Sequence, residues 1–165
     1  MKHKLNEAKK RKDDEYYTDY KDVAAQMELY MEELKGKWVY CPCDDHWSNF
    51  WKYFVDNFEK HQLKHLTATH IEFDKPNSYR LDYDGKEITQ TPLEGNGDFR
   101  SPECTKIKDE CDIVITNPPF SIFNDFLNLI VSFDKKYLVI SDDNKLSNVD
   151  IFPLIKNNQL WLGYT

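Results

Sequence analysis

Hydrophobic residues recur every three or four positions in several segments of the chain, a spacing that predicts amphipathic helices. The predicted helices run from an Asp19 or Asp22 N-cap to Leu34, from a Ser48 N-cap, from a Ser121 N-cap, and over 149–157. The residues expected to face inward are Val23, Met27, Tyr30, Met31 and Leu34, then Phe50, Trp51, Phe54 and Phe58, and then Phe123, Phe126, Leu127 and Ile130.

Short apolar runs lie between these helices and predict strands. They cover 37–41, 66–71, 112–116, 137–140 and 160–162. A hairpin is predicted where 79–83 and 87–89 flank Asp84-Gly85, a dipeptide typical of tight turns. Strands that alternate with helices predict a doubly wound α/β fold with a mostly parallel sheet and helices on both faces.

The most informative motif follows the strand at 112–116. There the chain reads Asn117-Pro118-Pro119-Phe120. Two prolines cannot continue a sheet, so the chain must leave it at this point. In open α/β sheets ligands bind at the carboxyl ends of strands. The motif is therefore expected to present an amide, a rigid turn and an aromatic face at the active-site edge of the sheet.

These residue types suit an exocyclic amino group on a flat ring, such as N6 of adenine. The Asn117 side-chain oxygen and the Pro118 carbonyl can accept hydrogen bonds from that group and favour a tetrahedral nitrogen able to attack a methyl donor. Pro119 stiffens the turn, and Phe120 offers a surface for a base removed from its helix. The alternative is a structural Pro-Pro loop with Asn117 as a turn former.

Three further segments indicate a cofactor site. Asp44 and Asp45 follow the first strand, and either acid can hold the amino group or the ribose hydroxyls of S-adenosylmethionine. Their alternative role is to favour the next helix N-terminus.

The other two segments lie far apart in the chain. Asp98 can accept from the cofactor adenine while Phe99 packs on its ring, unless this is an ordinary turn after the hairpin. Tyr17 and Thr18 can cover the methionine end. The usual glycine-rich dinucleotide motif is absent after the first strand.

Composition supports one compact catalytic domain. The chain has 165 residues, 40% of them hydrophobic, and neither a membrane-spanning apolar run nor a signal peptide is recognisable. We expect a disordered charged arm at 1–14 and a catalytic domain at 15–165. The spacing of the four cysteines predicts cytosolic thiols and no metal site. A net charge of −7 argues against strong nucleic-acid binding by this chain alone.

The chain resembles the EcoRI-type adenine-specific DNA methyltransferase family. The matching segments are 15–18, 39–45, 47–54, 97–101, 112–121, 151–155 and 161–165. The resemblance implies a Rossmann-like methyltransferase fold, a cytoplasmic bacterial or phage enzyme that methylates adenine N6 in double-stranded DNA, and a role in restriction–modification or in protection from it.

The resemblance also assigns roles to single residues. It implies cofactor contacts from Tyr17, Thr18, Asp44, Asp45 and Asp98, and target-base contacts from Asn117, Pro118, Pro119 and Phe120. Members of this family are usually longer, with a DNA-recognition part after the catalytic half. We therefore expect this chain to be truncated before that part.

Two other functions stay open at this point. One is methyl transfer to a different amino or amide group, in protein glutamine or RNA. The other is a non-catalytic protein that keeps the methyltransferase fold. The recognition sequence and the oligomeric state do not follow from the sequence.

Overall fold

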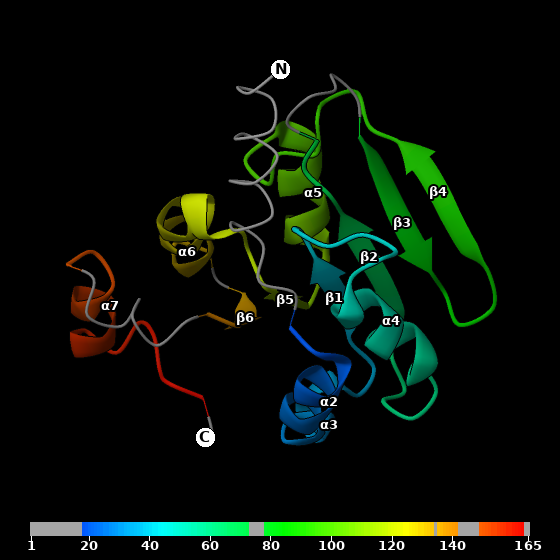
Figure 1. Ribbon diagram of the computed structural model, residues 1–165, viewed down its shortest axis with the longest axis horizontal. Coiled ribbons are helices and arrows are strands. Elements are labelled where there is room, and N and C mark those ends of the chain that lie inside the picture. Colours follow the sequence, from blue (N-terminus) through cyan, green and yellow to red (C-terminus); the bar gives the residue numbers. More distant parts are fainter. Residues whose placement is uncertain (1–17, 73–77, 134, 142–148, 164–165) are drawn as a thin grey trace, which may run out of the picture.

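A computed structural model describes residues 18–72, 78–133, 135–141 and 149–163, and the structural statements below concern these residues. A six-stranded sheet in the order β4-β3-β2-β1-β5-β6 forms the centre of the molecule (Figure 1). Its strands are β1 (Trp38–Cys41), β2 (His65–Thr69), β3 (Tyr79–Tyr83), β4 (Ile88–Pro92), β5 (Ile113–Thr116) and β6 (Lys136–Val139). The helices are α2 (Tyr20–Glu28), α3 (Met31–Leu34), α4 (Asn49–Asp56), α5 (Pro102–Glu110), the 3-10 turn η1 (Phe120–Ile122), α6 (Phe123–Val131) and α7 (Phe152–Lys156).

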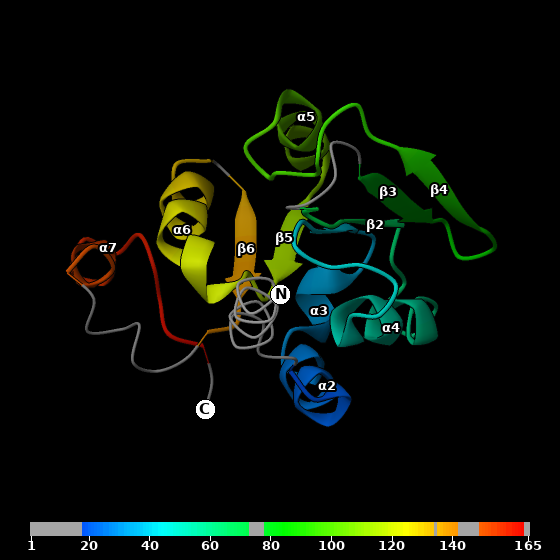
Figure 2. The same ribbon diagram turned by 45° about the horizontal axis from the view of Figure 1, so that its top comes forward.

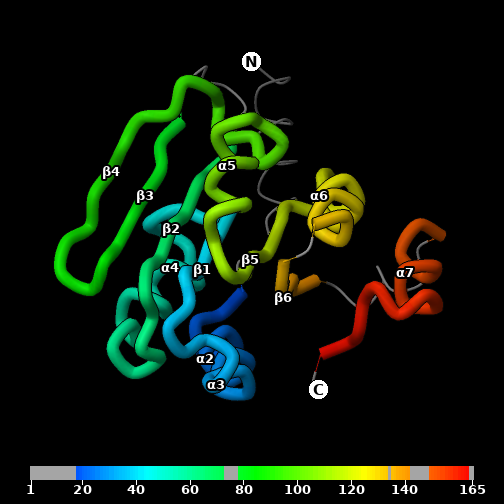
Figure 3. Tube along the Cα trace, turned by 180° about the vertical axis from the view of Figure 1, so that it is seen from behind, coloured from blue at the N-terminus to red at the C-terminus, as the bar shows by residue number. Residues whose placement is uncertain are grey.

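The strand pairing confirms the predicted α/β class. Strands β2, β1, β5 and β6 pair in parallel, while the β3–β4 hairpin is antiparallel and lies beyond β2. The chain first builds outward from β1 to β2, and then returns to place β5 on the other side of β1 (Figure 3). The direction of winding therefore changes between β1 and β5, where doubly wound sheets bind ligands.

Helices cover both faces of the sheet, as Figure 2 shows. Successive side chains of a strand point to opposite faces of the sheet, so neighbouring residues of β1 contribute to different hydrophobic cores. Val39 and Cys41 face the core under α2, α3 and α4, whereas Tyr40 faces the core under α5 and α6. Buried on both sides, β1 is apolar along its length, and this explains why its sequence was easy to recognise as a strand.

Local capping explains the starts of α2, α4 and α5. The Asp19 side chain accepts from the amide of Lys21 at the start of α2, and Ser48 caps α4, so both of these predicted caps are confirmed. The predicted helix to Leu34 is divided by a turn at residues 29–30 into α2 and α3. The predicted Ser121 cap is wrong, because η1 precedes α6 and the N-cap residue is Ile122 without a side-chain cap bond.

Other differences lie mainly in the last third of the chain. The predicted strand at 160–162 is wrong: these residues form no strand, and Trp161 and Leu162 are 71% and 60% exposed. Strand β6 is only half-buried because it lies at the edge of the sheet. Helix α5 was not predicted, although Ser101 as N-cap and Pro102 in the first turn are a typical helix start.

One polar network joins β2 and β3. The Asp82 carboxylate accepts hydrogen bonds from His65, Arg80 and Thr67, and its side chain is 15% exposed. Burial alone would raise the pKa of Asp82, but these hydrogen bonds outweigh it and lower that pKa to about 2. The network thus stabilises the antiparallel extension of the sheet.

The charged arm predicted at 1–14 lies outside the described residues. Within the part that is described, no helix has the length and apolar character needed to cross a membrane.

Candidate active site

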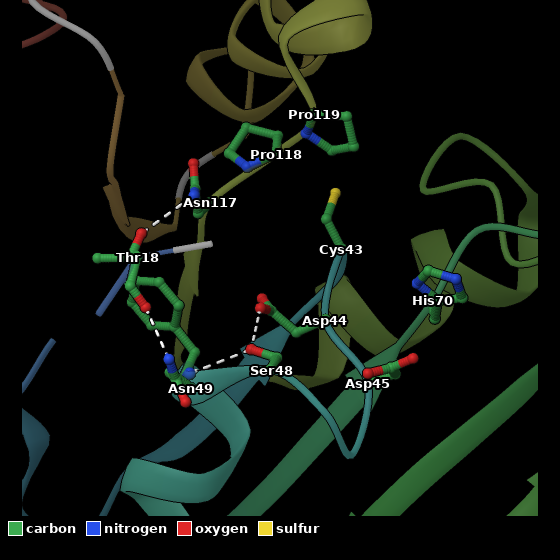
Figure 4. Close-up of a pocket in the computed structure, with 11 residues that line it drawn as sticks. Thr18, Cys43, Asp44, Asp45, Ser48, Asn49, His70, Asn117, Pro118 and Pro119 are labelled. Carbon is green, nitrogen blue, oxygen red and sulfur yellow. Dashed lines mark hydrogen bonds between the residues drawn. The ribbon is translucent and has the colours of Figure 1, made fainter. Parts of the chain in front are cut away.

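A pocket lies at the carboxyl ends of β1, β2 and β5, in front of the N-terminus of α4 (Figure 4). It leaves about 560 Å³ free of protein atoms, counted out to its solvent-open side. The pocket is lined by Thr18, Cys43, Asp44, Asp45, Ser48, Asn49, Phe50, His70, Asn117, Pro118 and Pro119.

Asp44 is the best-anchored acid of this pocket. Its side chain is only 5% exposed, and the Thr116 hydroxyl donates to its Oδ2 at 2.8 Å. The hydroxyl of Ser48 donates to Oδ1, and Ser48 in turn accepts from the backbone amide of Phe50 in the first turn of α4. The carboxylate therefore joins the ends of β1 and β5 to the N-terminus of a helix.

This environment changes the acidity of Asp44. Burial raises the pKa of the Asp44 carboxyl to about 6, although the hydrogen bonds from Ser48 and Thr116 act in the opposite direction. The neighbouring Asp45 carboxylate also raises this pKa. Near neutral pH, Asp44 is therefore an anion kept at a free-energy cost, as in sites that use a charge for binding.

Asp45 is more exposed than Asp44 and faces a different direction. Its Oδ1 accepts from the backbone amide of Trp47 at 2.8 Å, which shapes the turn before α4. Figure 4 shows its side chain directed toward His70 at the end of β2. The next residue, His46, is exposed and contacts the Tyr79 hydroxyl at 3.2 Å, so it does not line the pocket.

Asn117 lies across the pocket from Asp44. Its Nδ2 donates to the Thr18 hydroxyl at 3.1 Å, and the backbone carbonyl of Thr18 accepts from Nδ2 of Asn49 at 2.9 Å. Figure 4 shows the Asn117 nitrogen toward Thr18 and the oxygen on the opposite side. The structure thus brings Thr18 and Asn117 together although 99 positions separate them in the sequence.

The rest of the proline motif forms one wall. Pro118 and Pro119 are buried and line the pocket, while Phe120 is half-buried, begins η1 and is not a lining residue. The backbone of Pro119 is extended, with ψ 144°, so the chain turns sharply away from β5 only after the second proline.

Asp98 and Phe99 are placed apart from the pocket lining. Arg100 donates to the Asp98 carboxylate from Nε at 2.9 Å and from Nη2 at 2.7 Å, and this interaction lowers the pKa of Asp98. Phe99 is 4% exposed and packs edge-on against Phe126 in the core under α6.

A glycine holds this segment against the end of β2. Gly97 has a φ of +79°, and a Cβ at this position would lie 2.1 Å from the His70 carbonyl oxygen. The close approach fixes the loop that carries Asp98 beside His70, which does line the pocket.

The structure therefore unites Thr18, Asp44, Asp45, Asn117 and Pro118 with Pro119 in one pocket, while Tyr17 lies outside the described residues. Sequence reasoning identified Ser48 only as a helix cap and did not single out Asn49, His70 or Thr116. Two signals were available in the sequence. Thr116 ends a strand directly before the motif, and the polar pair Ser48-Asn49 starts a helix shortly after two acids.

The cysteines of the pocket region are free thiols. Cys41, Cys104 and Cys111 are buried and Cys43 is partly exposed. Burial raises the pKa of the Cys43 thiol well above its usual value, so it is not a ready nucleophile. Within the described ranges no group of three or more His, Cys, Asp or Glu side chains has metal-binding geometry.

Known proteins show a clear relationship. The family model described as adenine-specific methyltransferase EcoRI matches residues 4–165. The chain is 45% identical to the Type II methyltransferase M.MpnI of Mycoplasma pneumoniae and 39% identical to the Type II methyltransferase M.EcoRI of Escherichia coli. These matches include 99% and 96% of this chain but 51% and 54% of the relatives, so it spans about half their length. No solved structure matches the chain.

Proposed function

The chain belongs to the family of adenine-specific methyltransferases named after EcoRI, and from this premise we propose that it carries the catalytic site of a DNA adenine-N6 methyltransferase that uses S-adenosylmethionine. The observation that carries the proposal is the placement of Asn117, Pro118 and Pro119 opposite Asp44 and Asp45 in one pocket. Two sets of acceptors on facing walls suit a reaction between two bound molecules.

The base side would hold the amino group of the target adenine. The Asn117 oxygen and the Pro118 carbonyl would accept hydrogen bonds from it, and these bonds would strengthen as the nitrogen becomes tetrahedral. Interactions of this kind accelerate the chemical step because they are stronger in the transition state than in the ground state. Phe120, half-buried at the start of η1, would contact the flipped base.

The cofactor side has hydrogen-bond acceptors that fit a cationic, hydroxyl-rich ligand. Asp44 and Asp45 contribute two carboxylates to the pocket, and each carboxylate oxygen has two acceptor positions. Asp44 already accepts from Ser48 and Thr116, which leaves further acceptor positions on the same oxygens. Tyr17 would cover the methionine end, and Asp98, in the loop that Gly97 holds beside His70, would contact the adenine end.

S-adenosylmethionine supplies an electrophilic methyl group when it is bound. The residues of this chain would bind the two molecules, orient the amino nitrogen toward that group and exclude water. Catalysis would then depend on positioning and electrostatics, because none of the described residues that line the pocket is an activated nucleophile.

The complete protein would methylate double-stranded DNA, and the Type II names of the relatives support a restriction–modification role in the bacterial cytoplasm. The chain has a net charge of −7. We therefore expect it to bind DNA weakly and with strong salt dependence, and to need the region that its longer relatives add for recognition.

Single-turnover methyl transfer from labelled S-adenosylmethionine to unmethylated DNA tests the proposal. Asn117→Ala should lower the rate constant about 10²–10³-fold, in line with loss of one preorganised polar partner, and should leave cofactor affinity nearly unchanged. Phe120→Ala should weaken capture of the base by roughly 1–3 kcal/mol. Asn124→Ala, in α6 and away from the pocket lining, is the matched control.

Near-wild-type transfer by a folded Asn117→Ala variant would show that the turn is only structural. Methyl transfer to RNA or protein and not to DNA would instead favour another acceptor. A wild-type chain that binds no S-adenosylhomocysteine at millimolar concentration would contradict the cofactor assignment.

A further inference from the structure

Two hydrogen-bond chains meet at the start of α4. Ser48 donates to Asp44, which also accepts from Thr116. The next residue, Asn49, donates to the Thr18 carbonyl, and the Thr18 hydroxyl accepts from Asn117. Ser48 and Asn49 are adjacent in sequence, and so are Thr116 and Asn117. The two chains therefore form one ring around the pocket. Figure 4 shows its part from Asp44 through Ser48, Asn49 and Thr18 to Asn117.

This ring holds the Asn117 amide beside Thr18, with the amide nitrogen toward the hydroxyl. The Thr18 hydroxyl accepts from the amide nitrogen, so the oxygen lies on the other side. If the amide turned over, its NH2 group would occupy the position of the oxygen. An NH2 group there would face the amino group of a bound adenine, so two hydrogen-bond donors would meet. A donor without an acceptor inside a pocket costs free energy, because it has lost its bond to water.

Asn49 fixes the position of the hydroxyl itself. Its side-chain donor holds the backbone carbonyl of Thr18, one residue before the N-cap of α2. Without this contact, the segment that carries Thr18 would keep its α2 cap but would lose its direct bond to α4.

We infer that Thr18 and Asn49 are positioning residues for Asn117: Asn49 holds Thr18, and the Thr18 hydroxyl holds the Asn117 amide with its oxygen toward the target amino group. This role rests on the proposed function of Asn117. It differs from a direct cofactor contact by Thr18, and it gives Asn49 a role that its place in the first turn of α4 does not reveal.

Side-chain amide NMR of the chain itself tests the hydrogen bond without activity. Asparagine-labelled samples of wild type, Thr18→Val and Thr18→Ser should show the Asn117 Nδ2 protons shifted and faster-exchanging in the valine variant, with wild-type behaviour restored by serine. Asn49→Asp keeps the shape of the side chain and suits the first turn of a helix, but it removes the donor, and it should produce a similar change. Thr105→Val in α5 is the matched control.

Single-turnover kinetics then separates positioning from binding. Thr18→Val should lower the methyl-transfer rate constant roughly tenfold, as expected for loss of one net hydrogen bond, with the affinity for S-adenosylhomocysteine unchanged within about twofold. Thr18→Ser should recover most of the rate.

An Asn117 amide signal that is the same in wild type, Thr18→Val and Asn49→Asp would overturn the inference. So would a Thr18→Val variant that loses cofactor affinity as strongly as rate, since this would make Thr18 a cofactor contact. A wild-type chain that binds no S-adenosylhomocysteine would contradict the proposed function instead, while the NMR comparison would still decide whether Thr18 orients Asn117.

Discussion

Replacing Asp44 with asparagine should make the protein more stable at alkaline pH and weaken its cofactor binding. The Asp44 carboxyl is 5% exposed, and burial raises its pKa from 3.8 to about 6. Between these two values the folded protein binds more protons than the unfolded chain. The free energy of unfolding therefore falls as pH rises from about 4 to above 6.

The size of this effect follows from the two pKa values. A difference of about two pKa units at about 1.4 kcal/mol per unit gives roughly 3 kcal/mol as an upper value for the cost of the charge. Asparagine preserves the shape and an oxygen acceptor for Ser48 or Thr116 while removing the charge. Asp44→Asn should thus gain about 1–3 kcal/mol at pH 8 relative to wild type, and little or nothing at pH 4.

Urea denaturation at pH 4 and pH 8, at constant ionic strength, measures this pH dependence, and calorimetry with S-adenosylhomocysteine measures binding. Asp45→Asn is the control, since its side chain is more exposed and should give no comparable stability gain. If the difference in stability between Asp44→Asn and wild type is the same at both pH values, the buried-charge argument is refuted. Unchanged cofactor affinity would show that Asp44 has a purely structural role.

Three stability predictions follow from other parts of the fold. Because the pKa of Asp82 is about 2, its network should stabilise the protein above pH 4 and be lost as pH falls toward 2; Asp82→Asn should remove about 1–2 kcal/mol of acid-dependent unfolding free energy in urea titrations, and identical acid profiles would contradict this. Lys108 is 4% exposed, and its Nζ lies over the Phe133 ring with no hydrogen-bond partner in the described part of the chain, so Lys108→Met should raise the free energy of unfolding at pH 7 by about 1–2 kcal/mol, whereas a decrease would show that the cation–π contact outweighs the cost of burying the amine. Gly97→Ala should lower the melting temperature far more than Gly36→Ala, because both glycines have positive φ but only at Gly97 does an added Cβ meet a backbone oxygen; equal losses would refute the close-approach argument.

The sequence allowed the fold class to be predicted because the central strands are buried on both faces. Ile113–Thr116 and Trp38–Cys41 have almost no polar interruptions, so they are recognisable without tertiary information. Edge elements were harder. Residues 160–162 are apolar but unpaired, and apolar character alone does not distinguish a strand from an exposed segment.

The candidate site was predictable where its residues follow strands directly. Asp44, Asp45 and Asn117 lie at strand ends, and topology brings such ends together. The contact between Thr18 and Asn117 depends on how α2 packs on α4, and the bond between Thr116 and Asp44 depends on which strands neighbour each other. Neither relation has a local sequence signal, since each joins residues more than 70 positions apart.

These long separations in sequence affect the stability of the protein against unfolding and degradation in a cell. The pocket closes only when β1 and β5 lie side by side and the segment before α2 has docked, so a partly folded chain contains no complete pocket. A ligand of the pocket therefore binds the native state and stabilises it by mass action, by about 2.7 kcal/mol when its concentration is 100 times its dissociation constant. We expect the supply of methyl donor to influence the abundance of this protein as well as its reaction rate, because a chain without ligand unfolds more often and is degraded sooner.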